Sequence, residues 1–412
     1  MKAGRPEKRR EMNQNGQSDQ QEAHPNRLLI VDDDRGIVDL LTMQLRSGGY
    51  EIACAFGGEE ALEHIVRHAP DLILLDIAMP GVSGLDILTY VREHGLSIAV
   101  IMMTAFGSQD VAVDALRRGA DNYLIKPFGL DEIRLMVARA LDRLALERRS
   151  AALSRRLARE LTQAAQIQRD LLPGETISIP GFELQARCIS AREVGGDFYD
   201  WQYDSPNTLN LVLGDVMGKG MPAALLMTTI RATLRAVSHA HRPAEALDLA
   251  GQILKNDLLH SGMFTTVFCA QLDVESRRLR FVDAGHGHAL VWRADGSTER
   301  LQPRCFPLGV DLDEPYREGA IEFSPGDYLI VYSDGLVDSR PAAEAASPPL
   351  LPLLRGSASA AEAVDRLIQW ATPNHELSDD LTVLVLHCQE RVESHAGEAV
   401  AAAHDASMLP TV

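Results

Sequence analysis

Residues 71–81 read DLILLDIAMPG, an apolar run that ends at Asp76 and is stopped by Pro80 and Gly81. Other short apolar runs occur on both sides of it, at residues 28–32, 51–56, 99–104 and 122–127. Amphipathic stretches separate these runs, at residues 36–47, 58–68, 84–94, 108–118 and from 130 onward. Continuously apolar strands that alternate with helices are typical of a parallel sheet with helices on both faces. We therefore predict an α/β domain over residues 26–145.

Polar side chains stand where these apolar runs end. They are Asp32 and Asp33 in LLIVDDD, Asp76, Thr104 and Lys126. The carboxyl ends of parallel strands meet at one edge of the sheet, and in the strand order 2-1-3-4-5 the first and third strands are neighbours. Carboxylates gathered there repel one another, and a hard cation such as Mg²⁺ removes that cost. A hydroxyl and an ammonium group suit a phosphoryl group added to Asp76.

This set of residues, together with the segment LIKPF at 124–128, resembles the CheY-like receiver family of response regulators over residues 27–140. The resemblance implies that Asp76 is the phosphoacceptor and that a sensor histidine kinase or phosphotransfer protein is the partner. It also implies Mg²⁺ held by Asp32, Asp33, Asp76 and the backbone carbonyl of Ala78. Thr104 and Tyr123 would form the switch pair that moves on phosphorylation. For Tyr123 the alternative is an ordinary half-buried aromatic residue.

A helical pattern continues from the last amphipathic stretch of the receiver region. Apolar residues recur at helical spacing from Leu130 to Leu144 and again from Leu153 to Leu171, before Pro173 and Gly174. We predict a long helix that joins two domains, with a helical or coiled-coil linker over residues 146–175 and a homodimer formed through it. The alternative is a helix that packs on each domain.

The pattern changes over residues 176–388. Strand-like runs follow one another at 182–189, 209–215, 265–273, 278–284, 288–293, 328–333 and 381–387, and helices are predicted near 222–240, 244–260 and 361–371. Adjacent strands separated by turn residues favour antiparallel pairing. We predict an α+β domain with two mainly antiparallel sheets flanked by helices.

A second set of aspartates lies at strand ends in this region. They occur in EVGGDFYD, LVLGDVMGKG, LIVYSDGL and SDDLTVLVL, and are Asp197, Asp215, Asp334, Asp379 and Asp380. Each alone could be a turn or capping residue. Together they fit a two-metal centre, in which paired divalent cations activate a water and clamp a phosphoryl group.

These segments, with ARCISAREVGGDFYDW at 186–201 and AAQIQRDLLP at 164–173, resemble the SpoIIE-type branch of the metal-dependent PPM phosphatases. The resemblance implies a protein-serine/threonine phosphatase with two Mn²⁺ or Mg²⁺ ions. Asp215 would bridge both metals, Asp197 and the carbonyl of Val216 would complete one site, and Asp334 with Asp379 or Asp380 would hold the other. Asp379 is favoured because the first residue of the pair aligns in the wider family. The implied substrate is a phosphorylated regulatory protein, such as an anti-sigma-factor antagonist.

Two features depart from that family pattern. The segment over 338–354 is short and rich in proline and alanine, and AGHGHAL at 284–290 replaces a loop that commonly bears proline. His286 could act as a general acid, but a histidine in a glycine-rich turn is more often structural. Lys219 could steer a phosphate or be an ordinary exposed turn residue.

Composition limits the remaining possibilities. The net charge of −18 argues against a nucleic-acid or anionic-membrane binder, and the five scattered cysteines suit reduced thiols and no zinc site. We predict a cytoplasmic protein with a disordered tail at 1–25 and a flexible tail at 389–412. The combined prediction is a response regulator whose phosphorylation on Asp76 controls the phosphatase. The competing class is a non-catalytic adaptor, which would have lost the metal-binding acids.

Overall fold

The computed structural model describes residues 26–105, 109–310, 314–338, 350–372 and 377–390. The tail predicted at 1–25 lies outside these ranges, as does the tail predicted at 389–412 except for its first two residues. Most of the unusual segment at 338–354 also lies outside them. Contacts divide the chain into two compact units, one up to Leu157 and the other from Ala158 onward. Each unit is described by itself.

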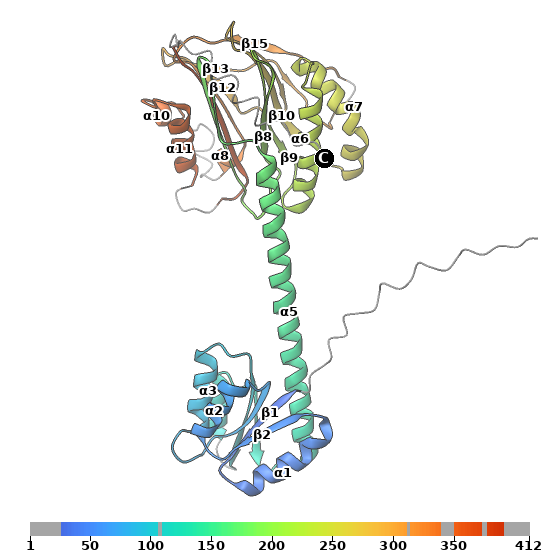
Figure 1. Ribbon diagram of the computed structural model, residues 1–412, viewed down its shortest axis with the longest axis vertical. Coiled ribbons are helices and arrows are strands. Elements are labelled where there is room, and N and C mark those ends of the chain that lie inside the picture. Colours follow the sequence, from blue (N-terminus) through green and yellow to red (C-terminus); the bar gives the residue numbers. More distant parts are fainter. Residues whose placement is uncertain (1–25, 106–108, 311–313, 339–349, 373–376, 391–412) are drawn as a thin grey trace, which may run out of the picture. The chain divides into compact units, whose positions relative to one another are not determined.

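The first unit is built on a five-stranded parallel sheet in the order β2-β1-β3-β4-β5, which confirms the predicted topology. Figure 1 shows this sheet with helices beside it. Its strands are β1 (Arg27–Val31), β2 (Glu51–Ala55), β3 (Leu72–Asp76), β4 (Ala99–Ala105) and β5 (Asn122–Lys126). Its helices are α1 (Arg35–Leu45), the short 3₁₀ turn η1 (Arg46–Gly48), α2 (Gly58–His68), α3 (Gly84–Glu93) and α4 (Gln109–Arg117), followed by α5 (Leu130–Leu171).

Apolar side chains fill both faces of this sheet. One core joins the sheet to α2, α3 and α4, and the other joins it to α1 and to the first part of α5. Strand β3 is buried along its whole length, as the uninterrupted apolar run predicts. Burial on both faces leaves the carboxyl edge of the sheet as the place where polar side chains reach solvent.

Helix α5 runs unbroken for 42 residues and joins the two units. Ile133, Val137, Leu141 and Leu144 bury their side chains in the first unit. Beyond them, Arg148 donates to Asp71 over 2.6 Å and to the carbonyl of Ser97 over 2.6 Å. Every residue from 145 to 160 is exposed.

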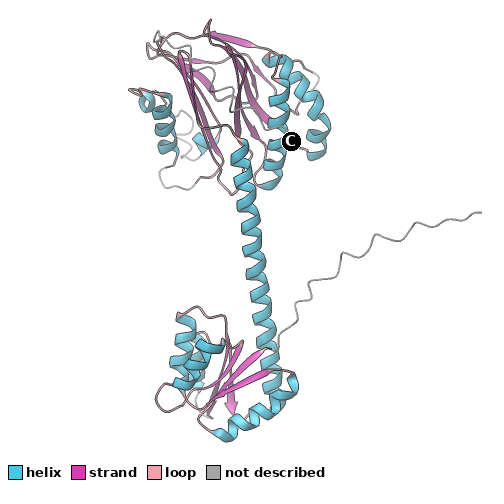
Figure 2. Cartoon of the chain, in the orientation of Figure 1, coloured by secondary structure: helices cyan, strands magenta, loops and turns pink. Residues whose placement is uncertain are grey.

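The second unit contains two six-stranded sheets that pack face to face (Figure 2). One has the order β14-β11-β10-β9-β8, with β15 paired to β11, and the other has the order β13-β12-β16-β17-β7-β6. The first sheet comprises β8 (Phe198–Ser205), β9 (Thr208–Val216), β10 (Thr265–Asp273), β11 (Arg278–Ala284), β14 (Arg304–Cys305) and β15 (Gly319–Glu322). The second comprises β6 (Thr176–Ile179), β7 (Phe182–Ile189), β12 (Ala289–Trp292), β13 (Thr298–Arg300), β16 (Tyr328–Tyr332) and β17 (Leu381–Cys388).

Helices cover the outer face of each sheet. Helices α6 (Met221–Val237) and α7 (Pro243–Ser261) pack on the β8–β11 sheet. The other sheet is covered by α8 (Gly335–Asp338), α10 (Leu350–Leu354) and α11 (Ala360–Ala371). A third core, which includes Phe182, Phe268 and Phe281, fills the space between the sheets. The pairing is antiparallel except between β11 and β14, which confirms the predicted fold class.

Several strands of this unit were not predicted from the sequence. Strand β8 begins one residue after the two glycines of EVGGDFYD, which indicate a turn. Its first four residues are buried, and the four that follow alternate partly exposed and exposed positions. Strands β6, β13, β14 and β15 have two to four residues each, too few to show a period. None of the described helices is long and apolar enough to cross a membrane.

Candidate functional site

The receiver edge brings together the three aspartates expected there. Carboxylate oxygens of Asp32, Asp33 and Asp76 all lie within 4.8 Å of one another. Asp32 and Asp76 are buried, while Asp33 is exposed. Burial raises the pKa of Asp76, and the nearby charges of Asp32 and Asp33 add to that effect. These three carboxylates together therefore favour the binding of a cation.

Lys126 supplies part of that charge. Its ammonium group lies 2.6 Å from Asp32 Oδ2 and 2.6 Å from Asp76 Oδ1. Thr104 is buried near the end of β4, and Tyr123 is half-buried on β5. Ala78, which was expected to contribute its carbonyl, lies exposed two residues after Asp76. The structure thus collects the acids and the lysine, whereas the switch role of Thr104 and Tyr123 stays a prediction.

The strand pairing of the second unit carries its aspartates to one end of both sheets. Asp197 precedes β8, and Asp215 lies near the end of β9, which is antiparallel to β8. On the facing sheet, Asp334 follows β16 and the Asp379–Asp380 pair precedes its antiparallel neighbour β17. The charges of Asp334 and Asp379 act on Asp215 across the two sheets. The sequence-predicted acids therefore face one another.

Burial disfavours the ionised form of these carboxyl groups unless a positive charge lies nearby. Burial and then the charge of Asp334 raise the pKa of Asp215 to about 7. Burial and the charge of Asp215 raise the pKa of Asp197 well above its usual range. Asp197 Oδ2 is enclosed and accepts no hydrogen bond from any described residue. A buried carboxylate oxygen without a hydrogen-bond donor suits a metal ligand.

A further acid was missed from the sequence. Oxygens of Asp334, Asp338 and Asp379 lie within 4.8 Å of one another, a spacing that would allow them to hold one cation. Asp338 ends the short helix α8, four residues after Asp334. Residues four apart on a helix share a face, so the DGLVD spacing was the signal that could have identified it.

The structure separates the roles of the two consecutive aspartates. Asp380 is buried, and its two oxygens accept the backbone N–H groups of Ala191 and Gly196 over 2.8 Å each. Asp379 is more exposed and lies 2.8 Å from the ammonium group of Lys219. Asp380 thus holds the EVGGD loop, whereas Asp379 shares the group formed with Asp334 and Asp338. These contacts support Asp379 as the ligand.

Alanine substitutions should distinguish these two roles. We expect Asp380→Ala to lower the metal-free stability by roughly 2–4 kcal/mol, because two buried N–H donors lose their acceptor. Asp379→Ala should leave that stability nearly unchanged and weaken the rise in melting temperature that added Mn²⁺ produces. Thermal unfolding with and without Mn²⁺ measures both effects. Equal stability loss in the two variants would contradict the assignment.

Two glycines allow the backbone to close around this centre. A Cβ atom on Gly335 would lie 2.0 Å from the carbonyl oxygen of Asp380. A Cβ atom on Gly196 would lie 2.7 Å from the carbonyl oxygen of Val216, the predicted backbone ligand. Both contacts are shorter than a real Cβ tolerates. The glycines of GGD and SDG are therefore required by the approach of neighbouring strands.

Helix α5 reaches the loop that carries Asp197. The side-chain amide of Gln168 donates to the carbonyl of Gly195 over 2.7 Å, and the N–H of Gly195 donates back to Gln168 Oε1 over 3.2 Å. Ala165 packs with Val194 of the same loop and with Ala224 of α6. The end of α5 therefore touches both the loop before Asp197 and the helix after Asp215.

His286 and Lys219 both contact neighbouring residues. His286 is buried, which lowers its pKa to about 3, and its Nδ1 lies 3.2 Å from the hydroxyl of Thr266. A neutral, enclosed imidazole is unsuited to donating a proton near neutral pH, which favours the structural interpretation. Lys219 pairs with Asp379 and donates to the carbonyl of Ser378 over 2.8 Å.

Both acid groups fit divalent cations by their donor chemistry. Each offers carboxylate oxygens only, the ligand type that Mg²⁺ and Mn²⁺ prefer. In the receiver, Asp32, Asp33 and Asp76 would hold Mg²⁺. In the second unit, the acids whose oxygens lie within 4.8 Å of one another are Asp334, Asp338 and Asp379, and the binding of two ions by Asp197, Asp215, Asp334 and Asp379 stays a prediction.

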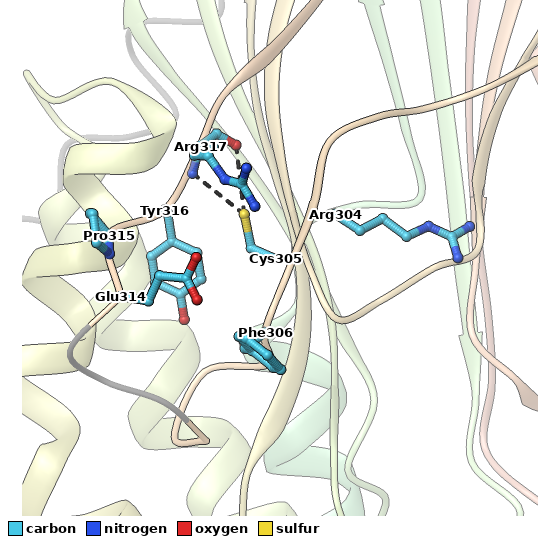
Figure 3. Close-up of a pocket in the computed structure, with 7 residues that line it drawn as sticks. All are labelled: Arg304, Cys305, Phe306, Glu314, Pro315, Tyr316 and Arg317. Carbon is cyan, nitrogen blue, oxygen red and sulfur yellow. Dashed lines mark hydrogen bonds between the residues drawn. The ribbon is translucent and has the colours of Figure 1, made fainter.

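A separate pocket lies away from these acids. Its volume is about 280 Å³ and its lining residues are Arg304, Cys305, Phe306, Glu314, Pro315, Tyr316 and Arg317 (Figure 3). The thiol of Cys305 accepts the N–H of Arg317 over 3.4 Å. None of the predicted site residues lines this pocket, so the functional assignment rests on the acid groups.

Comparison with known proteins agrees with this division. Residues 28–138 match the model of the response regulator receiver domain, and residues 205–389 match that of stage II sporulation protein E (SpoIIE). The chain is 44% identical over 117 residues to the regulatory protein AtoC of Escherichia coli (strain K12), covering 28% of this chain and 25% of that protein. It is 40% identical over 129 residues to the transcriptional regulatory protein DltR of Streptococcus agalactiae (serotype III, strain NEM316), covering 31% of this chain and 54% of that protein. The chain thus spans from a quarter to about half of the length of these curated relatives.

The second unit has a structural relative. The SiaA-PP2C domain of Pseudomonas aeruginosa superposes with a TM-score of 0.50 at 21% identity, covering 57% of this chain and 99% of that chain. This likeness shows the fold alone. Taken with the two matched families, it confirms the predicted domain types. The chain therefore carries a CheY-like receiver domain of the response-regulator family, joined by a long helix to a SpoIIE-type PPM phosphatase domain.

Proposed function

We propose that this protein is a response regulator whose phosphorylation on Asp76 controls a metal-dependent phosphoserine or phosphothreonine protein phosphatase. The observation that carries the proposal is the complete acid set of the second unit. Asp215 lies within the electrostatic field of Asp334 and Asp379, and Asp197 keeps an enclosed oxygen without a donor. An adaptor domain with no metal would gain nothing from burying these charges.

The residues have separate tasks in the proposed phosphatase. Two bound cations would supply Lewis-acid activation of a water and neutralise the phosphoryl oxygens. Asp215, which faces acids from both sheets, is the proposed shared ligand. Asp197 and the carbonyl of Val216 would complete one ligand set, and Asp334 and Asp379 the other. Asp380 and Gln168 hold the loop that carries Asp197.

Hydrolysis of an aryl phosphate with and without Mn²⁺ tests the enzyme proposal. We expect turnover by the wild-type protein that depends on Mn²⁺ and disappears on chelation. The adaptor alternative predicts no turnover under any metal condition. A serine phosphopeptide compared with a tyrosine phosphopeptide then tests the proposed specificity.

The receiver acids support phosphorylation of Asp76. Its Oδ1 is paired with Lys126, whose ammonium group would also neutralise an added phosphoryl group. Asp32, Asp33 and the carbonyl of Ala78 are the proposed partners of Mg²⁺ beside it. A sensor histidine kinase or phosphotransfer protein is the proposed donor, and Thr104 with Tyr123 the proposed switch.

Helix α5 is the proposed link between the two activities. Its end contacts Gly195 through Gln168 and packs with Ala224 of α6. Helix α6, predicted near 222–240 and found at Met221–Val237, follows the turn after Asp215. A shift of α5 against these two contacts would move ligands on both sides of the centre. The linker at 146–175 would therefore transmit the receiver state.

We further propose that α5 forms a homodimer. From residue 145 to 160 it is exposed throughout, yet it carries Leu146, Leu153 and Leu157, which are 66%, 68% and 55% exposed. Ile167 continues this seam and is 64% exposed. Spacings of seven and four residues place such side chains on one stripe, which suits a parallel coiled coil.

Charged substitutions in the seam test the dimer. Leu153→Glu combined with Leu157→Glu should convert a dimer to a monomer, because a coiled coil cannot bury paired carboxylates at its core. Light scattering during gel filtration measures the mass. Ala151→Glu with Ala152→Glu adds the same charge on the same exposed helix, outside the seam, and should leave the dimer intact. A monomeric wild type would refute the proposal.

The substrate and location extend this proposal. A phosphorylated regulatory protein such as an anti-sigma-factor antagonist is the proposed substrate class, by likeness to the family and from no particular residue. The proposed compartment is the cytoplasm, where phosphorelays operate and cysteines stay reduced.

A further inference from the structure

A group of side chains that the proposed chemistry does not use lies beside α8. In the β13-β12-β16 part of the sheet, Leu290 is paired with Arg300 on one side and with Ile330 on the other. Paired residues point to the same face, and residues two apart on a strand share that face. His288 and Tyr332 therefore lie on the same outer face as Arg300.

Direct contacts confirm this arrangement. The N–H of Tyr332 donates to the carbonyl of His288 over 3.1 Å, and the centres of their rings are 5.1 Å apart. Arg300 is exposed, and its side chain makes no hydrogen bond or ion pair with any residue in the described ranges. The strand pairing thus places an unpaired guanidinium group diagonally across from a histidine and a tyrosine.

Arg304 adds a second guanidinium group, which lies 3.7 Å from the carboxylate of the buried Asp283. Its side chain points away from the neighbouring pocket residues (Figure 3), and its guanidinium group donates to the carbonyl of Gly287 over 2.7 Å. Burial lowers the pKa of His288 and raises the pKa of Tyr332, and the charges of Arg300 and Arg304 act on both groups. We call Arg300, Arg304, His288 and Tyr332 the basic patch.

The basic patch borders the proposed metal centre. Tyr332 stands two residues before Asp334 on the same chain segment. The charge of Asp338, which belongs to the acid group with Asp334 and Asp379, also acts on His288. A protein whose phosphorylated residue reached the acid group would therefore lay its neighbouring residues near the basic patch.

Charge identifies what would bind there. The whole chain has a net charge of −18, so an exposed guanidinium group next to an acidic centre is opposite in sign to the net charge of the protein. Guanidinium groups pair with carboxylates through two parallel hydrogen bonds, and the half-buried His288 lies beside them. We infer that the basic patch binds acidic residues that flank the phosphorylated residue of the protein substrate. This inference rests on the proposed phosphatase activity and narrows its substrate class.

Arg300→Glu tests the inference with two phosphoserine peptides, one flanked by glutamates and one by lysines. We expect the wild-type protein to have the higher kcat/KM for the acidic peptide. In the variant, the ratio of the two kcat/KM values should fall roughly tenfold, because like charges now meet. Added salt should reduce the wild-type preference. Turnover of a small aryl phosphate, which cannot reach the patch, should be unchanged.

Arg278→Glu is the matched control. Arg278 is exposed at the start of β11, whereas the end of that strand leads to the loop that holds His286. It carries the same change of charge and should leave the peptide ratio unaltered. An unchanged ratio in Arg300→Glu, or an equal loss on the aryl phosphate, would overturn the inference. Failure of the wild type to hydrolyse the aryl phosphate would instead refute the phosphatase itself.

Discussion

Asp215→Asn should lower metal-dependent phosphatase turnover by roughly 10²–10³-fold or more, because it removes the carboxylate proposed to serve both metal ligand sets. Burial and neighbouring acids raise the pKa of Asp215 to about 7, so its ionised form needs a positive charge beside it. An amide oxygen is neutral and would neutralise neither cation. Steady-state hydrolysis of an aryl phosphate over a range of Mn²⁺ concentrations measures the loss.

The control for this variant is Asp273→Asn. Asp273 pairs with Thr208 at the opposite end of the β9–β10 ladder, so its substitution changes the same chemical group far from the centre. It should retain wild-type turnover. Equal turnover by wild type and Asp215→Asn would remove the phosphatase proposal. If turnover is lost as expected, the Asp215→Asn protein can retain its substrate, and phosphosite mapping of captured proteins would identify it.

Asp76→Asn should abolish phosphorylation of the receiver by acetyl phosphate or a cognate kinase. The substitution removes the attacking oxygen while keeping a polar side chain beside Lys126. Labelling that is stable in acid and lost in hydroxylamine measures acyl phosphate formation. Asp39→Asn on the exposed face of α1 should label as wild type. Equal labelling of wild type and Asp76→Asn would refute the phosphoacceptor assignment.

The same variant tests the link through α5. Phosphorylation of the wild type should change the phosphatase rate, the oligomeric state, or both, and Asp76→Asn should show neither change. The direction depends on which state of α5 places Gln168 correctly against Gly195. A phosphorylated wild type with the same rate and mass would contradict transmission through the linker.

The sequence was most informative where the chemistry is local. Apolar runs that end in aspartate predicted the receiver sheet and its order, because strands buried on both faces cannot contain polar residues. The structure shows that the glycines beside Asp197 and Asp334 approach the carbonyls of Val216 and Asp380, which their positions in the sequence do not specify. Short edge strands such as β13 and β15 left no periodic signal, so the sheet containing Arg300 could not be drawn from the sequence.

By itself, the sequence determined the two domain types, the long helix between them and the acids of both centres, because motif and hydrophobic period are written in neighbouring residues. Only the tertiary structure decided between Asp379 and Asp380, since that choice depends on two N–H donors some 190 residues away. It also added Asp338 to the acid group and brought Gln168 to Gly195. The basic patch beside α8 likewise could not be predicted from the order of residues in the sequence. Such contacts arise from strand register and sheet packing, which a linear pattern of residues does not specify.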